Sequence, residues 1–190
     1  VVVVVGGGPA GSATAKSLAD KGLYDVQLFE AYPHPEKINK NAPKAYVIAL
    51  GARGQRGIQS AANIDPTKIP NSIVSNNLAR HPSGAVRKHD AYPSLIIPRK
   101  VLAGHLLDEA EKAGVSINFE QSLVDINFEK RVARFQSKKT KAVTEIQYDL
   151  LVGADGSKSR VRSLLSEANT GDFSVVRTEE DSMEYQVVVL

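Results

Sequence analysis

The chain has 190 residues, of which 42% are hydrophobic and 24% charged, values typical of a globular protein with room for one domain and the start of another. It has no cysteine, which excludes disulfides, thiol redox chemistry and thiolate metal sites, and its four histidines share no metal-ligand spacing. The net charge is +3, but the basic residues are scattered and only 6% of residues are aromatic, a composition that argues against nucleic-acid binding.

The N-terminal segment predicts a strand, a helix and a second strand. Residues 1–11 read VVVVVGGGPAG, so an apolar run leads directly into a glycine-rich turn. The β-branched run predicts a buried strand, and the small side chains that follow predict a helix from about Pro9 to Lys21. A second apolar run, Val26–Phe29, predicts a parallel strand beside the first one.

The glycines of this turn and one acidic residue match a dinucleotide-binding fingerprint. Gly6 permits a sharp turn, Gly8 lets a phosphate touch the backbone, and Gly11 lets the helix lie close to the strand. Glu30 lies about 20 residues after Gly11, where a carboxylate can bind the ribose hydroxyls of an adenosine. The helix N-terminus would point free N–H groups at a pyrophosphate. We therefore favour nucleotide binding over a purely structural glycine turn.

The middle of the chain predicts antiparallel strands around one helix, followed by a second helix. The expected elements are a strand over Ala45–Leu50, a helix opened by Gly51–Gly54, a hairpin of Ser72–Arg80 with Ala85–Tyr92, a strand over Leu95–Ile97, and a helix from about Arg99 to Gly114.

Alternating apolar residues in the next segment predict a three-stranded β-meander. The alternating runs are 115–119, 123–128, 132–135 and 143–146. The lysine-rich segment Lys138–Lys141 lies between two of them and predicts a solvated hairpin loop. Leu150–Val152 is fully apolar, which predicts a central strand of the first sheet. This strand ends in a second glycine turn, Gly153–Ser157, and a helix follows from about Ser159 to Leu165.

Two strand-to-helix turns with a meander between them predict an α/β, Rossmann-like FAD/NAD(P)-binding fold with a parallel sheet and an inserted antiparallel β-meander. A simple NAD(P)-linked dehydrogenase, which remains an alternative, has no such insertion. The motifs GGGPAGSATA…FE, IPRKVLAGHLL and DLLVGADGSKSRVR closely resemble the FAD-binding half of the p-hydroxybenzoate hydroxylase-like (class A) flavoprotein monooxygenases. Within that group, ALGARGQRGI, SLIIPR and FSVVRTEEDSMEYQVVVL are most similar to the kynurenine 3-monooxygenases. Geranylgeranyl reductases share the first motif and are the alternative among flavoenzymes.

The resemblance implies a set of FAD contacts. The expected contacts are Gly6, Gly8, Ala10 and Gly11 at the pyrophosphate, Phe29, Glu30 and Ala31 at the adenosine, Ala49 and Arg53 along the flavin, Arg99 at the phosphates or ribityl chain, Leu123 at the adenine, and Asp155 with Gly156 as a motif associated with both FAD and NADPH.

Three of these residues also have simpler interpretations. Arg99 at a helix start could be a surface charge, although its planar fork suits a phosphate. Arg53 could be an ordinary loop arginine. Asp155 could cap the helix that follows it, with Gly156 easing the turn, and this role is compatible with ligand binding.

The implied activity is that of an FAD-dependent, NAD(P)H-consuming monooxygenase that hydroxylates a small aromatic substrate with O₂ through a flavin C4a-hydroperoxide, with NADPH as a transient co-substrate. The flavin carries this chemistry, so we assign no catalytic residue and no metal ligand. In the kynurenine enzymes an arginine and a tyrosine hold the substrate carboxylate, whereas Asn77 and Pro93 occupy those positions here, so kynurenine is only suggested as the substrate. A non-enzymatic binding module similar to Rab GDP-dissociation inhibitors is a further alternative.

The ends of the chain suggest a fragment. The sequence lacks an initial methionine and stops inside an apolar run. We expect an FAD-binding domain over 1–170 and the truncated start of a substrate-domain sheet over 171–190, with a strand from near Met183 and an unpaired apolar edge at Val187–Leu190. No stretch reaches the ~20 apolar residues of a membrane helix, so the default expectation is a cytoplasmic protein.

Overall fold

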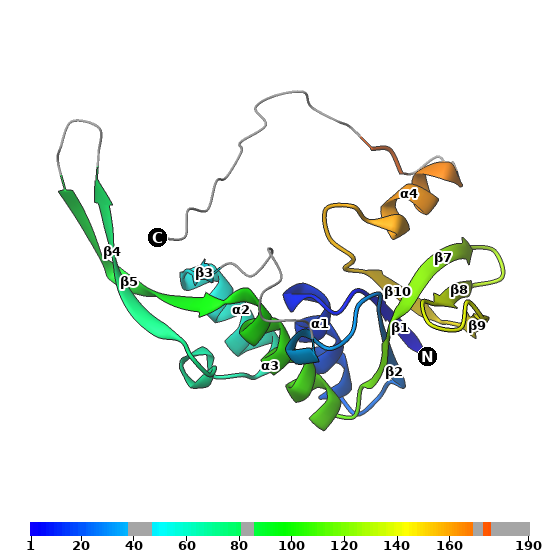
Figure 1. Cartoon of the computed structure of the whole chain (residues 1–190), viewed down its shortest axis with the longest axis horizontal. Helices are drawn as coiled ribbons and strands as arrows, with labels where there is room; N and C mark the ends of the chain where they lie inside the picture. Colours follow the sequence, from blue (N-terminus) through cyan, green and yellow to red (C-terminus); the bar gives the residue numbers. More distant parts are fainter. Residues whose placement is uncertain (38–46, 81–85, 169–172, 176–190) are drawn as a thin grey trace.

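The computed structural model describes residues 1–37, 47–80, 86–168 and 173–175, and for residues 76–80, 86–92 and Glu36 it describes the backbone only. The expected strand near Met183, the edge at Val187–Leu190 and most of the expected second domain, 171–190, lie outside these residues. Figure 1 shows an α/β body built on a parallel sheet, from which a long hairpin projects.

A four-stranded parallel sheet forms the centre of the body, in the order β10-β1-β2-β6. Its strands are β1 (Val2–Val5), β2 (Val26–Glu30), β6 (Ser116–Phe119) and β10 (Leu150–Gly153). The helices around it are α1 (Pro9–Ala19), α3 (Arg99–Lys112) and α4 (Arg160–Glu167). This arrangement confirms the βαβ unit predicted from the N-terminal segment.

The valine run forms β1 because both faces of this strand are covered. Val3 and Val5 pack with Phe29 against residues of α4 and the meander. Val2 and Val4 pack on the opposite face with residues of α1 and α3. A strand buried on both faces requires a continuous apolar run rather than alternation, which is why the consecutive valines of Val2–Val5 suit this position.

The projecting part is a second sheet with strand order β3-β5-β4, covered by a short helix (Figure 1). Its elements are β3 (Val47–Leu50), α2 (Ala52–Ala62), β4 (Ile73–Arg80) and β5 (Val86–Pro98), and two 3-10 turns, η1 (Pro35–Lys37) and η2 (Pro66–Lys68), lie in the connections. The predicted hairpin is confirmed, but Leu95–Ile97 is part of β5 and does not form a separate strand. Leu95, Ile97 and Ile58 form the centre of the core between this sheet and α2.

The inserted meander is also confirmed. It consists of β7 (Gln121–Asn127), β8 (Val132–Ser137) and β9 (Val143–Gln147), paired antiparallel in chain order. The first alternating run, 115–119, does not join it, because β6 pairs in parallel with β2. The meander packs on the parallel sheet through Phe135, whose ring stacks on that of Phe29 with centroids 3.8 Å apart.

One prediction about the sheet is wrong. Leu150–Val152 was expected to be central, yet β10 lies at the edge of the parallel sheet among the described residues, with β1 as its neighbour. Leu150 is 50% exposed there. An apolar run indicates contact with a core, and Leu151 does pack against one, but the run does not specify how many strands lie beyond it.

Within the part of the chain that the structure describes, no helix has the length and apolar character needed to span a membrane.

Two helical glycines have opposite surroundings and provide a stability test. A Cβ on Gly11 would overlap the carbonyl oxygen of Gly6 and come within 3.2 Å of the Ala154 Cβ, whereas a Cβ on Gly57 would meet nothing within 4 Å. We expect Gly11→Ala to lower the free energy of unfolding by about 1–3 kcal/mol, because α1 must move away from β1. Gly57→Ala should raise it by up to about 1 kcal/mol, because alanine restricts the unfolded chain. Urea unfolding of both variants measures this difference, and equal effects would contradict it.

Candidate functional site

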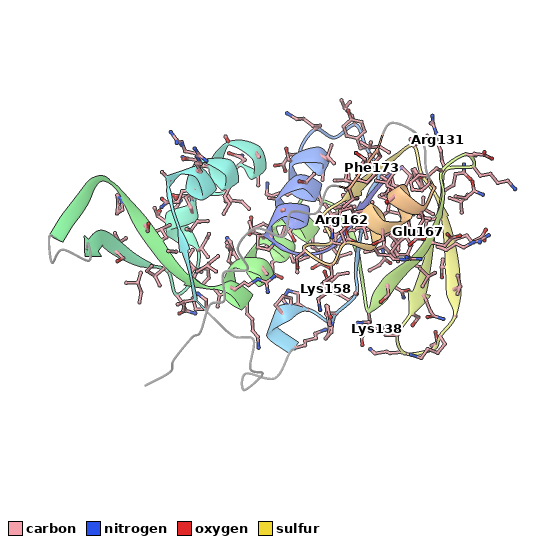
Figure 2. The ribbon with its side chains drawn as sticks, turned by 90° about the horizontal axis from the view of Figure 1, so that it is seen from above. Arg131, Lys138, Lys158, Arg162, Glu167 and Phe173 are labelled. Carbon is pink, nitrogen blue, oxygen red and sulfur yellow. The ribbon has the colours of Figure 1, made fainter. Side chains whose placement is uncertain are left out.

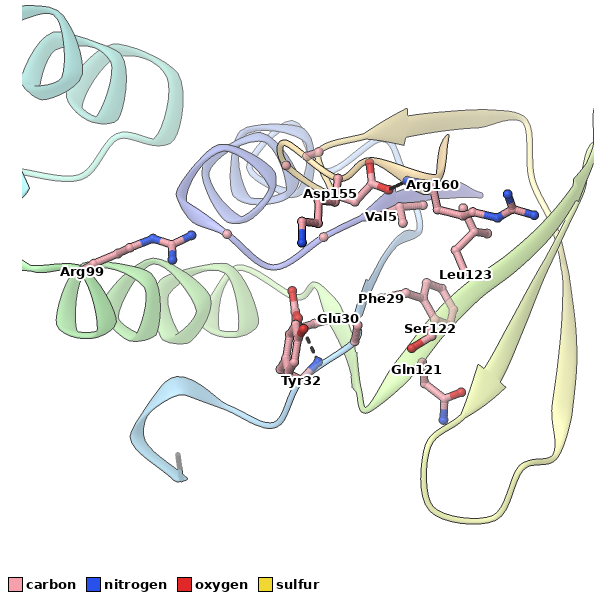
Figure 3. A pocket seen from close by; sticks show the side chains of 16 residues that line it. Val5, Phe29, Glu30, Tyr32, Arg99, Gln121, Ser122, Leu123, Asp155 and Arg160 are labelled. Atoms are coloured by element: carbon pink, nitrogen blue, oxygen red, sulfur yellow. Dashed lines mark hydrogen bonds between the residues drawn. The ribbon is translucent and has the colours of Figure 1, made fainter. Parts of the chain in front are cut away.

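A cavity of about 360 Å³ lies where β1, β2 and β10 end. Because these strands are parallel, their carboxyl ends meet at one edge of the sheet, which is where open α/β sheets bind ligands. Figure 3 shows side chains from the strand ends, from the start of α3 and from β7 around this space. The lining residues are Val5, Gly6, Gly8, Phe29, Glu30, Ala31, Tyr32, Arg99, Gln121, Ser122, Leu123, Ala154, Asp155, Gly156, Lys158 and Arg160.

The glycine turn places the N-terminus of α1 at this cavity. Gly6 has a φ of +105°, and a Cβ there would lie 2.5 Å from the carbonyl oxygen of Ala154, so the position requires glycine. Gly8 is the N-cap of α1, and a Cβ on it would meet nothing within 4 Å. The backbone of Gly8 is therefore open to the cavity, and no side chain caps the first turn of α1. Free N–H groups and the helix dipole at such a turn favour an anion.

Glu30 links the glycine turn to the end of β2. Its Oε2 accepts a hydrogen bond from the Gly7 N–H at 2.6 Å, and its Oε1 accepts one from the Tyr32 N–H at 2.9 Å. A carboxylate can accept about four hydrogen bonds, so these two leave capacity for the hydroxyl groups of a ligand. Glu30 therefore fixes the shape of the turn and also presents acceptors at the cavity wall (Figure 3).

Asp155 holds the loop after β10 against the start of α4. Its Oδ2 accepts hydrogen bonds from the N–H groups of Arg160 at 2.6 Å and Val161 at 3.2 Å, and its Oδ1 accepts one from the Ser159 hydroxyl at 2.6 Å. Ser159 itself is the N-cap residue, and its Oγ accepts from the Arg162 N–H at 3.0 Å. Asp155 therefore bonds the first two N–H groups of α4, but the N-cap position considered for it belongs to Ser159. Gly156 has a φ of +81° in the turn that follows Asp155.

Three cationic side chains reach this cavity from different elements. Arg99 is the first residue of α3, as its sequence position predicted, and Lys158 lies in the loop before α4. Arg160 donates to the Glu167 carboxylate at 3.0 Å and to the Val124 carbonyl at 3.3 Å. With these three cations against the carboxylates of Glu30 and Asp155, the described lining residues carry a net positive charge, which favours an anionic ligand.

Most of the predicted contact residues meet at this one cavity, and a few do not. Those that line it are Gly6, Gly8, Phe29, Glu30, Ala31, Arg99, Leu123, Asp155 and Gly156. Gly11 is buried behind the turn, and Ala10 is exposed on α1. Ala49 on β3 and Arg53 on α2 are exposed and belong to the other sheet, so the structure does not bring them to this cavity. The roles of all these residues toward a ligand stay predictions.

Sequence reasoning missed several lining residues. Lys158 and Arg160 follow the glycine turn at Asp155, so a search for cations near that motif could have found them. Tyr32 stands two residues after Glu30 and could have been noted as its neighbour. Gln121 and Ser122 start the first strand of the meander, and no local pattern distinguishes them from other polar strand residues.

The model of one protein family, described as "FAD binding domain", matches residues 1–189 of the chain. Curated relatives include the kynurenine 3-monooxygenase of Stenotrophomonas maltophilia (strain K279a), 25% identical over 169 residues, which are 86% of this chain and 37% of the relative. The kynurenine 3-monooxygenase of Anopheles gambiae is 29% identical over 189 residues, 96% of this chain and 39% of the relative. The chain therefore spans less than half the length of these relatives.

Solved structures support the same fold. A tetrameric form of 2-methyl-3-hydroxypyridine-5-carboxylic acid oxygenase has a TM-score of 0.62 and 26% identity, covering 86% of this chain and 41% of that one. The flavin-dependent monooxygenase PieE, crystallised in complex with FAD and substrate, has a TM-score of 0.65 and 21% identity, covering 87% of this chain and 31% of that one. These findings confirm the predicted fold and the resemblance to class A flavoprotein monooxygenases.

The bonding of Asp155 to the start of α4 can be measured as stability. Asp155→Ala removes the acceptors of two N–H groups at the start of α4, so we expect the free energy of unfolding to fall by about 1–2 kcal/mol. Ser163 serves as the control on the same helix, because among the described residues its hydroxyl bonds the Ser159 carbonyl alone, at 3.1 Å. Ser163→Ala should change stability by less than about 0.5 kcal/mol. Chemical unfolding compares the two variants, and a loss confined to Ser163→Ala would refute the assignment.

Proposed function

The chain belongs to the FAD binding domain family, and we propose that its cavity holds the ADP half of FAD in an NAD(P)H-consuming monooxygenase that hydroxylates a small aromatic substrate with O₂. The observation that carries this proposal is the convergence of the glycine turn, Glu30 and Asp155 on one cavity, although they come from three different strand ends. The relatives are longer than this chain, so the activity is proposed for the whole protein.

The residues present fit FAD. The backbone at Gly8 is open where a diphosphate would approach the first turn of α1, and the cavity has cations on its rim. Glu30 has acceptor capacity for ribose hydroxyls. Gln121 and Ser122 at the start of β7 line the same cavity and complete its wall on the side of the meander.

FAD, when bound, supplies the redox chemistry of NAD(P)H oxidation and O₂ activation. The chain itself binds and orients the cofactor. Glu30 and Asp155 each accept two or more hydrogen bonds from neighbouring protein groups, so neither carboxylate is placed as a general acid or base. These carboxylates hold the glycine turn and the loop between β10 and α4 in place, which preorganises the N–H groups proposed to bind the diphosphate.

Two features favour a flavoprotein over a simple NAD(P)-linked dehydrogenase and over a non-enzymatic binding module. The meander β7–β9 supplies Gln121, Ser122 and Leu123 to the cavity wall, and a simple dehydrogenase domain has no such insertion. The retained glycine turn and Glu30 argue against a non-enzymatic module that has lost its cofactor. Flavin absorbance in the purified protein tests this choice, since neither a dehydrogenase nor a module of the GDP-dissociation-inhibitor type would carry it.

The substrate is proposed only as a class. The named relatives act as kynurenine 3-monooxygenases and the structural neighbour as an oxygenase of a hydroxypyridine carboxylic acid. In this chain Asn77 and Pro93 stand where the kynurenine enzymes are expected to hold the substrate carboxylate, and the side chain of Asn77 is not among those described. We therefore propose a small aromatic substrate and leave kynurenine as one member to be tested.

Glu30 should be needed for FAD affinity. Glu30→Gln removes the negative charge that would bind ribose hydroxyls. It also replaces one carboxylate oxygen, which accepts a hydrogen bond, by an amide NH₂ group, which would face a backbone N–H. We expect FAD binding to weaken by about 1.5–3 kcal/mol, or roughly ten- to a hundredfold. Glu109→Gln is the control, because that carboxylate pairs with Lys112 at 2.7 Å on α3 and does not line the cavity. Unchanged FAD affinity for Glu30→Gln in a calorimetric titration would exclude the ribose role.

Arg99 should contribute more than general positive charge. It lines the cavity at the start of α3, whereas Arg56 is exposed on α2 and does not line it. We expect Arg99→Ala to weaken FAD binding by about tenfold, because a charge-assisted contact to phosphate is lost. Arg56→Ala should leave the dissociation constant within twofold. If both variants weaken binding equally, Arg99 has no dedicated phosphate contact.

A further inference from the structure

Tyr32 is an exposed aromatic residue that is nevertheless held in place at the cavity. It is 62% exposed, so hydrophobic burial contributes little to its position. Its N–H donates to the Glu30 Oε1 at 2.9 Å, and its carbonyl oxygen accepts from the Glu120 N–H at 3.4 Å. Figure 3 shows its side chain beside Glu30. These contacts fix the backbone of Tyr32, and so the point from which its ring extends, next to the carboxylate proposed to bind ribose.

Lys138 fixes the ring itself. Its Nζ lies over the Tyr32 ring, 4.0 Å from the centroid, so the two side chains form a cation–π pair. Lys138, which is labelled in Figure 2, lies in the turn between β8 and β9 at one end of the meander. Its own N–H donates to the Glu120 carbonyl at 2.8 Å, and Lys139 pairs with the Glu120 carboxylate at 2.6 Å. The turn is therefore anchored to the same residue that bonds Tyr32.

We propose that Tyr32, positioned by Lys138, is the aromatic surface on which the adenine of FAD stacks, an inference that rests on the proposed function. In a bound adenosine the base is attached to the ribose whose hydroxyls meet Glu30, so the base lies next to this carboxylate. Tyr32 and Leu123 line the cavity there. With Lys138 on one face, the ring has a second face for a planar ligand, and base–aromatic stacking is a strong contact. Lys138 is a positioning residue because it acts through Tyr32.

The experiment compares four variants of the whole FAD-binding protein, stripped of flavin. Tyr32→Leu removes the ring, and Tyr32→Phe keeps it. Lys138→Met removes the cation but keeps most of the stem. Lys141→Met removes the same charge from the other end of the same turn, where the side chain is exposed and has no ion pair or ring contact among the described residues. The dissociation constant of FAD and the inhibition constant of ADP as its competitor are measured for each variant, with unfolding midpoints as a check of folding.

The stacking role predicts a specific pattern. Tyr32→Leu should weaken FAD about tenfold, and ADP by the same factor, because the lost contact lies in the half that both ligands share. Lys138→Met should weaken both about threefold, while Tyr32→Phe and Lys141→Met stay within twofold of the wild type.

Each contrary result has one meaning. FAD binding that is unchanged in Tyr32→Leu would overturn the stacking role and leave the proposed function standing. A loss for FAD without a loss for ADP would place Tyr32 outside the adenosine end and overturn it as well. Equal losses for Lys138→Met and Lys141→Met would show an effect of general charge and overturn the positioning role of Lys138. A wild-type protein that binds no FAD would overturn this inference and the proposed function together.

Discussion

The cavity depends on close backbone packing at the end of β1, which only glycine permits. The first turn of α1 lies directly on the Gly6 carbonyl at Gly11, and Gly6 in turn lies against the carbonyl of Ala154 after β10. Side chains at these positions would push the helix and the β10 loop away from the strand. Because both approach so closely, the N-terminus of α1, the end of β2 and the start of α4 converge on one space. The cavity is therefore a direct result of how the helix packs on the sheet.

The two carboxylates at this site stabilise the protein before they meet any ligand. Glu30 bonds the glycine turn to the segment after β2, and Asp155 bonds the β10 loop to α4. Such contacts keep the donors and acceptors of the cavity in place without a ligand, which lowers the ordering cost of binding. This role agrees with a sequence that contains a dinucleotide-binding fingerprint and in which we assign no acid–base pair. In a flavoprotein the reactive group is the cofactor, and the protein needs rigid contacts more than it needs titrating ones.

The parts of the site that could be predicted from sequence are those set by local geometry. A glycine turn between a strand and a helix, and an acid at the end of the next strand, have fixed relative positions in a βαβ unit, so Gly6, Gly8 and Glu30 meet as expected. The position of β10 at the sheet edge depends on strand order, which its apolar composition does not encode. Lys138 was expected in a solvated loop, yet it contacts Tyr32, a residue more than a hundred positions earlier in the chain. A contact of this kind depends on how the meander packs, and no local pattern reports it.

The meander therefore has a role in the site as well as in the fold. Phe135 of β8 stacks on Phe29 of β2, which places β7 beside the cavity and brings the β8–β9 turn to the rim. A shift in register between Leu123 and Asp125 bends β7 at the point where it lines the cavity. In the proposed arrangement, the parallel sheet provides the end of the site that would hold the diphosphate, whereas the wall at the proposed adenosine end comes from the insertion. This division explains why the glycine fingerprint by itself does not distinguish a flavoprotein of this family from a dehydrogenase, and why the meander does.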